Sequence, residues 1–129
     1  MSLPLRWSVV IVDFDPTAGH EHAGERRALI VSHDPFHASG MATVCPISAR
    51  EPRYPGEVRI PAGHVGQTKD AVILCHQVRT IDMVRVQAFE IGGQVQRVTD
   101  RGIRGQVRAA LARHLGLDVT DAVDGADPG

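Results

Sequence analysis

Short runs of valine, isoleucine and leucine recur along this chain, and glycine, proline and aspartate separate them. Each run is a few residues long, which suits a strand better than a helix. We therefore expect strands over residues 8–13, 27–33, 41–48, 57–60, 71–75 and 77–81. Many short strands at this spacing predict a mostly β domain, either a small barrel or a sandwich.

The pattern changes after Gly93, where apolar residues take up helical spacing. The periodic positions are Val98, Ile103, Val107, Ala110, Leu111 and Leu115. Thr99 or Asp100 is a suitable N-cap, and Gly116 stands where a C-cap belongs. We expect one C-terminal helix on the β domain. Its arginines, Arg104, Arg108 and Arg113, lie mostly off the apolar stripe and form either a solvated face or a binding surface.

The 129 residues suffice for one domain with one core. We assign that domain to residues 1–118 and expect the acidic segment 119–129, which has few large apolar side chains, to be a flexible tail. Open sheet edges in a domain this small are often covered by a second copy, so a homodimer is plausible.

Fourteen basic and fifteen acidic residues give a net charge of -1, so the overall charge carries no nucleic-acid signal, although it can hide a local basic patch. No apolar run is long enough for a membrane helix, and the N-terminus lacks the features of a signal peptide. We expect a cytoplasmic protein with no membrane partner. Cys45 and Cys75 each lie in an apolar run and are expected to be buried, reduced thiols; a disulfide or a reactive thiol is the alternative.

The segment DFDPTAGHEHAGERRALIVS, residues 13–32, places a long charged loop between two predicted strands. Arg26 and Arg27 carry paired N–H donors that suit a phosphate, and Glu21, His20 and His22 can move protons. The combination fits phosphodiester chemistry on a nucleic acid with no nucleotide cofactor. Solvated loops often have the same composition, so the residues alone leave both interpretations open.

The chain has seven histidines, so a metal site must be considered. The close pairs are His20 with His22 and His33 with His37, and Pro35 argues against a helix that would present the second pair on one face. No carboxylate or cysteine completes a recognisable ligand set. We expect no metal and no cofactor.

The loop segment resembles the opening of the MazF/PemK family of toxin endoribonucleases, which has a strand, a D-x-x-P-x-x-G-x-E-x-x-G-x-R-P loop and a second strand ending in serine. Similar segments follow in the family's order: GMATVCPISAR, YPGEVRI, VILCHQVRTID and ALARHLGL. The resemblance spans roughly residues 7–117.

This resemblance implies an SH3-like β-barrel with a C-terminal helix, as in the MazF and CcdB toxins, assembled as a homodimer. It also implies metal-independent, sequence-specific cleavage of single-stranded RNA, often mRNA. The 2′-hydroxyl would attack the adjacent phosphate and leave 2′,3′-cyclic phosphate and 5′-hydroxyl ends. A cognate antitoxin would occupy the RNA groove.

The family's catalytic arginine falls on Arg26, which would stabilise the phosphorane or protonate the leaving oxygen; otherwise it is a surface arginine paired with Glu25. The loop glutamate falls on Glu21, which would accept the 2′-hydroxyl proton, orient Arg26, or only shape the loop. The catalytic threonine falls on Ser48, whose hydroxyl can donate to a phosphate oxygen or to a strand-end turn.

The sequence departs from the family pattern at several of these positions. Arg27 replaces the usual proline, and Ser48 the usual threonine. His76 stands where the family often has aspartate before Gln77, and it is either a general base or a strand histidine with its own partner. The candidate RNA-binding residues are Arg27, His20, His22, Tyr54, Gln77 and Arg79.

Two other functions remain open at this point. One is a non-enzymatic toxin on the same fold, like the CcdB group, which binds DNA gyrase. The other is a catalytically weakened relative that only binds. The set of Arg26, Glu21 and Ser48 favours the nuclease, because a gyrase-binding protein needs none of it.

Overall fold

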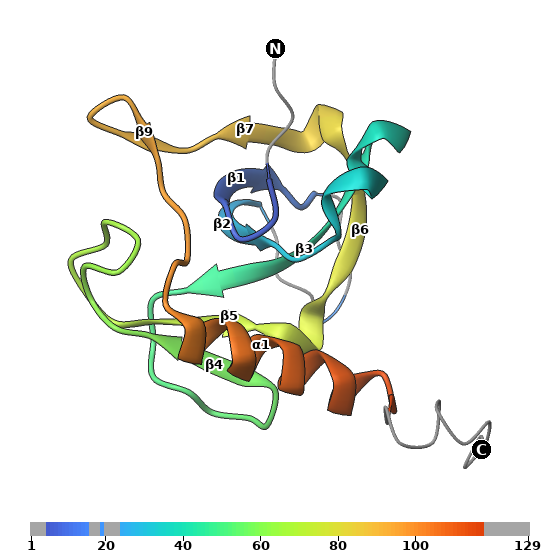
Figure 1. The fold of residues 1–129 in the computed structure, drawn as a ribbon. Coiled ribbons are helices and arrows are strands. Elements are labelled where there is room, and N and C mark those ends of the chain that lie inside the picture. Colours follow the sequence, from blue (N-terminus) through green and yellow to red (C-terminus); the bar gives the residue numbers. More distant parts are fainter. Residues whose placement is uncertain (1–4, 16–18, 20–23, 118–129) are drawn as a thin grey trace.

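A computed structural model describes residues 5–15, 19 and 24–117, and Figure 1 shows how the chain is arranged. The strands are β1 (Val9–Asp13), β2 (Glu25–Ile30), β3 (Met41–Ser48), β4 (Glu57–Ile60), β5 (Ala71–Leu74), β6 (Arg79–Asp82), β7 (Val86–Ala88), β8 (Glu90–Ile91) and β9 (Gln94–Val95). The helix α1 spans Arg101–His114, and 3-10 turns lie at Asp34–Ser39, Cys75–Gln77 and Met83–Arg85.

The long strand β3 joins the parts of the main sheet. The strand order is β4-β5-β3-β2-β1-β7, and β6 pairs with the first half of β3 while β5 pairs with its end. All these pairings are antiparallel. The strands β8 and β9 form a separate hairpin. This architecture confirms the expectation of a mostly β fold with a C-terminal helix.

Both faces of the central strands are buried, which explains why their sequences are continuous apolar runs. Val9 and Leu29, a pair across β1 and β2, belong to one core cluster. Val10 and Ala28, the next pair, belong to another cluster that contains Phe14. Successive residues of a strand point to opposite faces, so one short run supplies both clusters.

The helix α1 packs against β4 and the 3-10 turn Cys75–Gln77 and closes the first core cluster (Figure 1). Ile103, Val107 and Ala110 are its buried face, as the periodicity predicted. The N-cap is Asp100, whose carboxylate accepts a hydrogen bond of 2.8 Å from the backbone N–H of Ile103. Gly116, just past the helix, has a left-handed φ of 68°, as the expected C-cap position requires.

The predicted second strand had the wrong limits. It runs over Glu25–Ile30 and not to residue 33, because the chain turns into the 3-10 helix Asp34–Ser39. Pro35 lies in the first turn of this helix, where proline is tolerated, so the segment is helical after all. The helix does not present both histidines on one face, because His33 precedes it and is exposed. His37 is buried there, and its Nε2 lies 2.6 Å from the hydroxyl of Ser32.

Other limits also differ from the sequence-based expectations. Cys75 and Gln77 were assigned to strands but belong to a 3-10 turn, whose chain reversal separates β5 from β6. The strands β7, β8 and β9 were not predicted, because they are short and mostly exposed, without a continuous apolar run.

Cys45 and Cys75 are free thiols and both are buried, as expected. A side-chain contact with Cys75, together with burial, raises the pKa of the Cys45 thiol. The helices in the described part of the chain include none that is both long and apolar enough to cross a membrane.

Candidate active site

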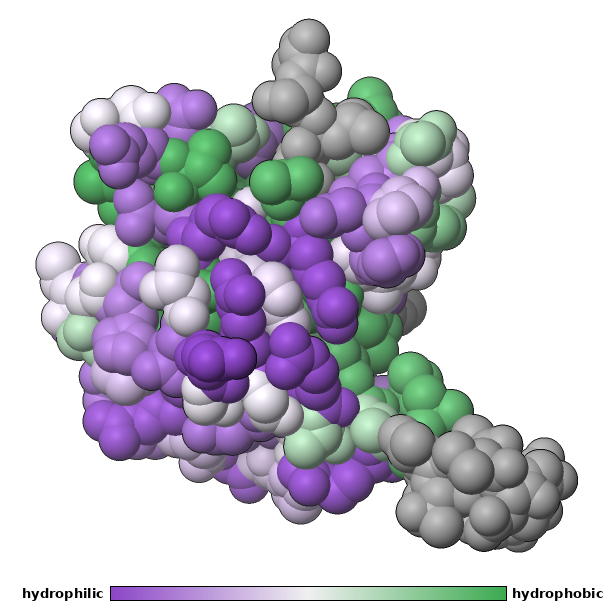
Figure 2. Space-filling model, in the orientation of Figure 1, coloured by the Kyte–Doolittle hydropathy of each residue, from purple (hydrophilic) through white to green (hydrophobic). Residues whose placement is uncertain are grey.

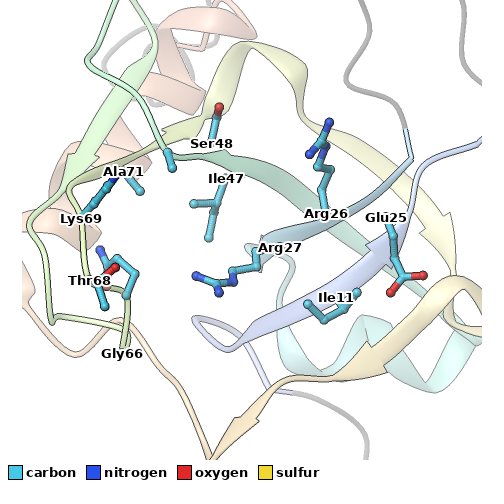
Figure 3. Close-up of a pocket in the computed structure, with 12 residues that line it drawn as sticks. Ile11, Glu25, Arg26, Arg27, Ile47, Ser48, Gly66, Thr68, Lys69 and Ala71 are labelled. Atoms are coloured by element: carbon cyan, nitrogen blue, oxygen red, sulfur yellow. The ribbon is translucent and has the colours of Figure 1, made fainter.

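A pocket of about 600 Å³ opens where β2 begins and β3 ends (Figure 3). Its walls carry cationic, hydroxyl and amide groups. The lining residues are Ile11, Glu25, Arg26, Arg27, Ile47, Ser48, Ala49, Gly66, Gln67, Thr68, Lys69 and Ala71. The pocket therefore combines two adjacent arginines, a lysine and a serine hydroxyl, a set suited to an anionic ligand.

Arg26 and Ser48 come from neighbouring antiparallel strands. The pairing of β2 with β3 ends at Ala28 and Pro46, and Arg26 and Ser48 each lie two residues beyond that pair on their strands. Figure 3 shows both side chains projecting to the same side of the sheet. The sequence thus places a guanidinium and a hydroxyl at one end of the same pair of strands.

Arg27 points away from Arg26, as adjacent residues of a strand do. Its side chain reaches toward the loop that carries Gly66 and Thr68 (Figure 3). The guanidinium lies 4.7 Å from the ring centroid of Phe89, a cation–π contact that fixes its position. Arg27 therefore offers a second, separately oriented cation to the pocket.

The opposite wall of the pocket is the loop 61–70, which side-chain hydrogen bonds hold in shape. The Gln67 carbonyl oxygen accepts from the Val65 N–H at 3.0 Å, and its amide donates to the carbonyls of Ile60 and Pro61. At the loop's end, Asp70 accepts from the Ala62 N–H at 2.8 Å. These bonds give Thr68 and Lys69 a defined position beside the arginines.

Hydrogen bonds hold the residues just before β2 against the end of β1. The Gly24 N–H donates to the Asp15 carboxylate at 3.0 Å, and the Phe14 N–H donates to the Gly24 carbonyl at 2.9 Å. Arg85 donates to the carbonyls of Asp13 and Asp15. Arg26 therefore lies two residues from Gly24, which these bonds hold in place. Glu21, His20 and His22 lie outside the described residues.

A second pocket, of about 370 Å³, adjoins the first and shares Ile11 and Glu25 with it. The carboxylates of Asp13, Asp15 and Glu25 and the guanidinium of Arg85 line it.

His76 belongs to another polar cluster, centred on Glu57. The Glu57 side chain is fully buried and accepts two hydrogen bonds from Arg50, at 2.8 and 2.5 Å. The Arg50 guanidinium, with the backbone N–H groups of Arg53 and Tyr54, outweighs burial and lowers the pKa of Glu57 to about 2. The Nε2 of His76 lies 3.6 Å from the same carboxylate.

The remaining candidate residues lie near this second cluster or on β6. The Tyr54 ring is 60% exposed, and its centroid is 5.9 Å from that of His76. Gln77 ends the 3-10 turn after β5. Arg79 lies on β6, with its guanidinium 5.5 Å from the centroid of the buried Phe14 ring. None of these four side chains, His76 included, lines the pocket that contains Arg26 and Ser48 as the described residues define it.

Gln67 and Thr68 line the pocket but were not among the residues predicted from the sequence. The signal available for them was the glycine-rich connection between two predicted strands, because such loops carry binding groups on rigid supports. Among residues 5–15, 19 and 24–117, no three His, Cys, Asp or Glu side chains meet in an arrangement that could hold a metal ion.

Residues 5–115 match the model of a family described as the PemK-like, MazF-like toxins of type II toxin–antitoxin systems. The endoribonuclease toxin MazF of Escherichia coli is 38% identical over 82 residues, 61% of this chain and 68% of that protein. The endoribonuclease toxin ChpB of the same species is 34% identical over 101 residues, 76% of this chain and 86% of that protein.

The fold is similar to that of solved family members. A crystal structure of MazF from Deinococcus radiodurans superposes with a TM-score of 0.71 at 29% identity and covers 91% of this chain and 100% of that one. A MazE-MazF structure from the same organism gives a TM-score of 0.67 at 27% identity, with 91% and 100% coverage. With the matched family model and this fold, the chain belongs to the PemK-like, MazF-like toxins of type II toxin–antitoxin systems.

Proposed function

We propose that this protein is an endoribonuclease toxin that cleaves single-stranded RNA without a metal, by attack of a 2′-hydroxyl on the adjacent phosphate. The observation that carries the proposal is the pocket shared by Arg26 and Ser48, in a family whose relatives named above are endoribonucleases. The products would be a 2′,3′-cyclic phosphate and a 5′-hydroxyl, with mRNA as the principal target.

In the proposed reaction, a base removes the proton of the 2′-hydroxyl, the new O2′–P bond forms, and the P–O5′ bond breaks. The leaving 5′ oxygen takes up a proton. The guanidinium of Arg26 would stabilise the charge on the phosphorane or supply that proton. The hydroxyl of Ser48 would donate to a non-bridging phosphate oxygen. Fixed donors of this kind lower the barrier because they are oriented before the charge develops.

Arg27 and Lys69 would hold the RNA on either side of the scissile phosphate. Both are exposed cations at the pocket, and Arg27 is held by its stacking on Phe89. Tyr54 is the exposed ring best suited to stack an unpaired base, with Gln77 and Arg79 as further contacts. Glu21, His20 and His22, in the segment of the sequence between β1 and β2, would add further contacts to the RNA.

Either Glu21 or His76 is the general base, and the two residues require the RNA to lie in different places. Glu21 is on the loop that leads into Arg26. His76 faces Glu57 outside the pocket, so a role as base requires the RNA to extend to the Glu57 cluster. Comparing the pH–rate profiles of Glu21→Gln and His76→Gln with the wild type identifies the base, since only loss of the base removes its titration from the profile.

A cognate antitoxin would inhibit the toxin by covering the pocket. The solved MazE-MazF complex of a family member supports such a partner. We further propose a homodimer, because the sheet ends in exposed strands that a second copy can cover. Sedimentation measurements on the purified protein, with and without antitoxin, test both assemblies.

The test of the proposed function is incubation of the purified toxin with mixed single-stranded RNA in excess EDTA. Cleavage that persists in EDTA, gives cyclic phosphate ends and disappears in Arg26→Ala supports the proposal. Arg113→Ala, an exposed arginine on α1 outside the pocket, is the matched control and should cleave normally. A folded protein that cuts no RNA would contradict the proposal and favour a binding toxin of the gyrase-inhibitor type.

A further inference from the structure

Four arginines from three segments of the chain lie around Trp7. The guanidinium carbons of Arg6, Arg104 and Arg108 lie 4.9, 5.3 and 5.4 Å from the Trp7 ring centroid. Arg97 joins them, because its guanidinium donates to the backbone carbonyl of Arg6 at 3.2 Å. We call Arg6, Arg97, Arg104 and Arg108 the arginine cluster. Figure 2 shows hydrophilic side chains gathered on the face that carries α1.

The guanidinium groups of the arginine cluster have no direct ion pair, although the Asp34 carboxylate accepts a hydrogen bond of 2.7 Å from the backbone N–H of Arg6. In the described part of the chain, no carboxylate lies within ion-pair distance of its guanidinium groups. Burial and the repulsion of Arg97, Arg108 and Arg6 together lower the pKa of Arg104. The Nε of Arg6 is buried without a hydrogen-bond partner among the described residues. Because the whole chain has a net charge of -1, this excess does not follow from a basic composition.

The cluster is held in place by the backbone. Trp7 is the one non-glycine residue among those described with a positive φ, at 73°, a conformation that a bulky side chain adopts only when its surroundings enforce it. The Nε of Arg104 donates to the Val98 carbonyl at 2.7 Å. Guanidinium groups fixed in this way lose little freedom when an anion binds.

The geometry favours an anionic group over a base as the ligand. The Trp7 ring is only 4% exposed and its surroundings are occupied by guanidinium groups, so it has no free face on which a base can stack. Guanidinium groups bind phosphate oxygens through paired N–H donors. The cluster therefore suits a chain of phosphates whose bases point elsewhere.

The rim of the pocket leads to the cluster. Gly66 lines the pocket and packs so tightly on β8 that an added Cβ would collide with the side chain of Ile91, and it would lie 3.3 Å from the side-chain oxygen of Gln96, just after β9. The next residue is Arg97, which forms an isolated bridge with Ser8 beside Trp7. Gln96 therefore lies between Gly66, which lines the pocket, and Arg97, which belongs to the cluster.

We propose that the arginine cluster binds the phosphodiester backbone of the RNA outside the segment held in the pocket, as a second contact that adds affinity without reading sequence. The identity of the ligand as RNA rests on the proposed function. The cluster itself would bind any suitably spaced phosphates.

Trp7 is the only tryptophan of the chain, so its fluorescence reports on this site alone. The experiment titrates the protein with 2′-O-methyl single-stranded RNA, which cannot be cleaved by 2′-hydroxyl attack, at several salt concentrations. Wild type is compared with Arg104→Gln/Arg108→Gln, with the single variant Arg97→Gln, and with the exposed control Arg113→Gln. Circular dichroism checks that each variant is folded.

Long oligonucleotides should change the Trp7 fluorescence of the wild type. The double variant should bind them at least tenfold more weakly, and the slope of log K against log salt should fall by about 1.4, the value for two phosphates on a single strand. Arg97→Gln, an exposed position, should reduce the slope by about half as much and keeps the test valid if the double variant does not fold. Arg113→Gln should match the wild type.

Unchanged affinity and salt slope in folded cluster variants would overturn this proposal, whatever else the cluster binds.

Cleavage assays distinguish failure of this proposal from failure of the proposed function. A short substrate that fills only the pocket should be cut equally well by the wild type and by Arg97→Gln, whereas a long RNA should show a higher KM with the variant. Binding that depends on the cluster in a protein that cuts no RNA would leave this proposal standing while the proposed function fails.

Discussion

Arg50 donates two hydrogen bonds to the buried carboxylate of Glu57, from one guanidinium nitrogen at 2.8 Å and from the other at 2.5 Å. The same carboxylate accepts from the backbone N–H of Arg53 at 2.6 Å. The pair thus fixes the loop 49–56, which carries the exposed Tyr54 ring, onto the start of β4. Glu57 has no access to water, so its charge depends on these donors.

Glu57→Gln should lower the free energy of unfolding by about 3 kcal/mol at pH 7, since it leaves Arg50 without its charged partner. The pKa of Glu57 falls from its ordinary 4.5 to about 2 on folding, so the carboxylate stabilises the fold above about pH 4.5. That contribution is lost as the pH falls toward 2, and the difference between variant and wild type should shrink over the same range. Urea denaturation at pH 7, 4 and 3 measures it.

Arg59→Gln is the control for this comparison. Arg59 pairs with Asp70, but its side chain is 56% exposed, and pairs in water contribute little. The expected loss is therefore much smaller than that of Glu57→Gln. Equal losses in the two variants at pH 7 would show that burial of Glu57 has no special energetic consequence.

Ser48→Ala should reduce the single-turnover cleavage rate by about tenfold to a hundredfold, because a hydroxyl donor to the phosphate is lost while the strand is preserved. Ser48→Thr keeps the hydroxyl and should retain most of the activity. Quenched-flow cleavage of one defined oligonucleotide compares the three proteins. If the alanine variant cleaves as fast as the threonine variant, the hydroxyl has no part in the reaction.

Arg27→Ala should raise KM for RNA several-fold and change kcat little, since we assign Arg27 to backbone binding and not to the scissile phosphate. The substitution also removes the exposed cation–π contact between Arg27 and Phe89, so the free energy of unfolding should fall by no more than about 1 kcal/mol. Steady-state kinetics with one RNA substrate provide the test. A fall in kcat with constant KM would instead place Arg27 in the chemical step.

A chain that ends at Asp118 should fold and cleave RNA as the full chain does. The removed residues are acidic and include few large apolar side chains, so they can bury little surface. Calorimetry and a cleavage assay on the truncated chain check this. A marked fall in Tm would show that the segment contributes to the core.

The strands were predictable where both faces are buried. Residues 9–10 and 28–30 are apolar at every position because alternate residues enter different core clusters. The strands β7 to β9 gave no such signal, since exposed residues such as Gln87 and Gln94 need no apolar side chain. The 3-10 helix at Asp34–Ser39 was missed because proline was treated as a helix breaker, although it stands in the first turn.

For the candidate site, the features that depend on contacts between distant segments could not be predicted from the sequence. Arg26 and Ser48 could be chosen from the sequence, and strand register then brings them to one pocket. The position of His76 beside Glu57 could not, because it depends on how the loop 49–56 meets the turn after β5. The helix arginines, which fit a solvated face by spacing alone, could not be linked to Trp7 without the fold.

The central claim is that the guanidinium of Arg26 acts on the phosphate during cleavage. The most direct measurement is the single-turnover cleavage rate of Arg26→Ala at saturating protein, with binding of 2′-O-methyl RNA measured in parallel. We predict a rate about a hundredfold to a thousandfold below that of the wild type, with RNA affinity changed far less. A variant that binds the RNA and cleaves it at the wild-type rate would contradict the claim.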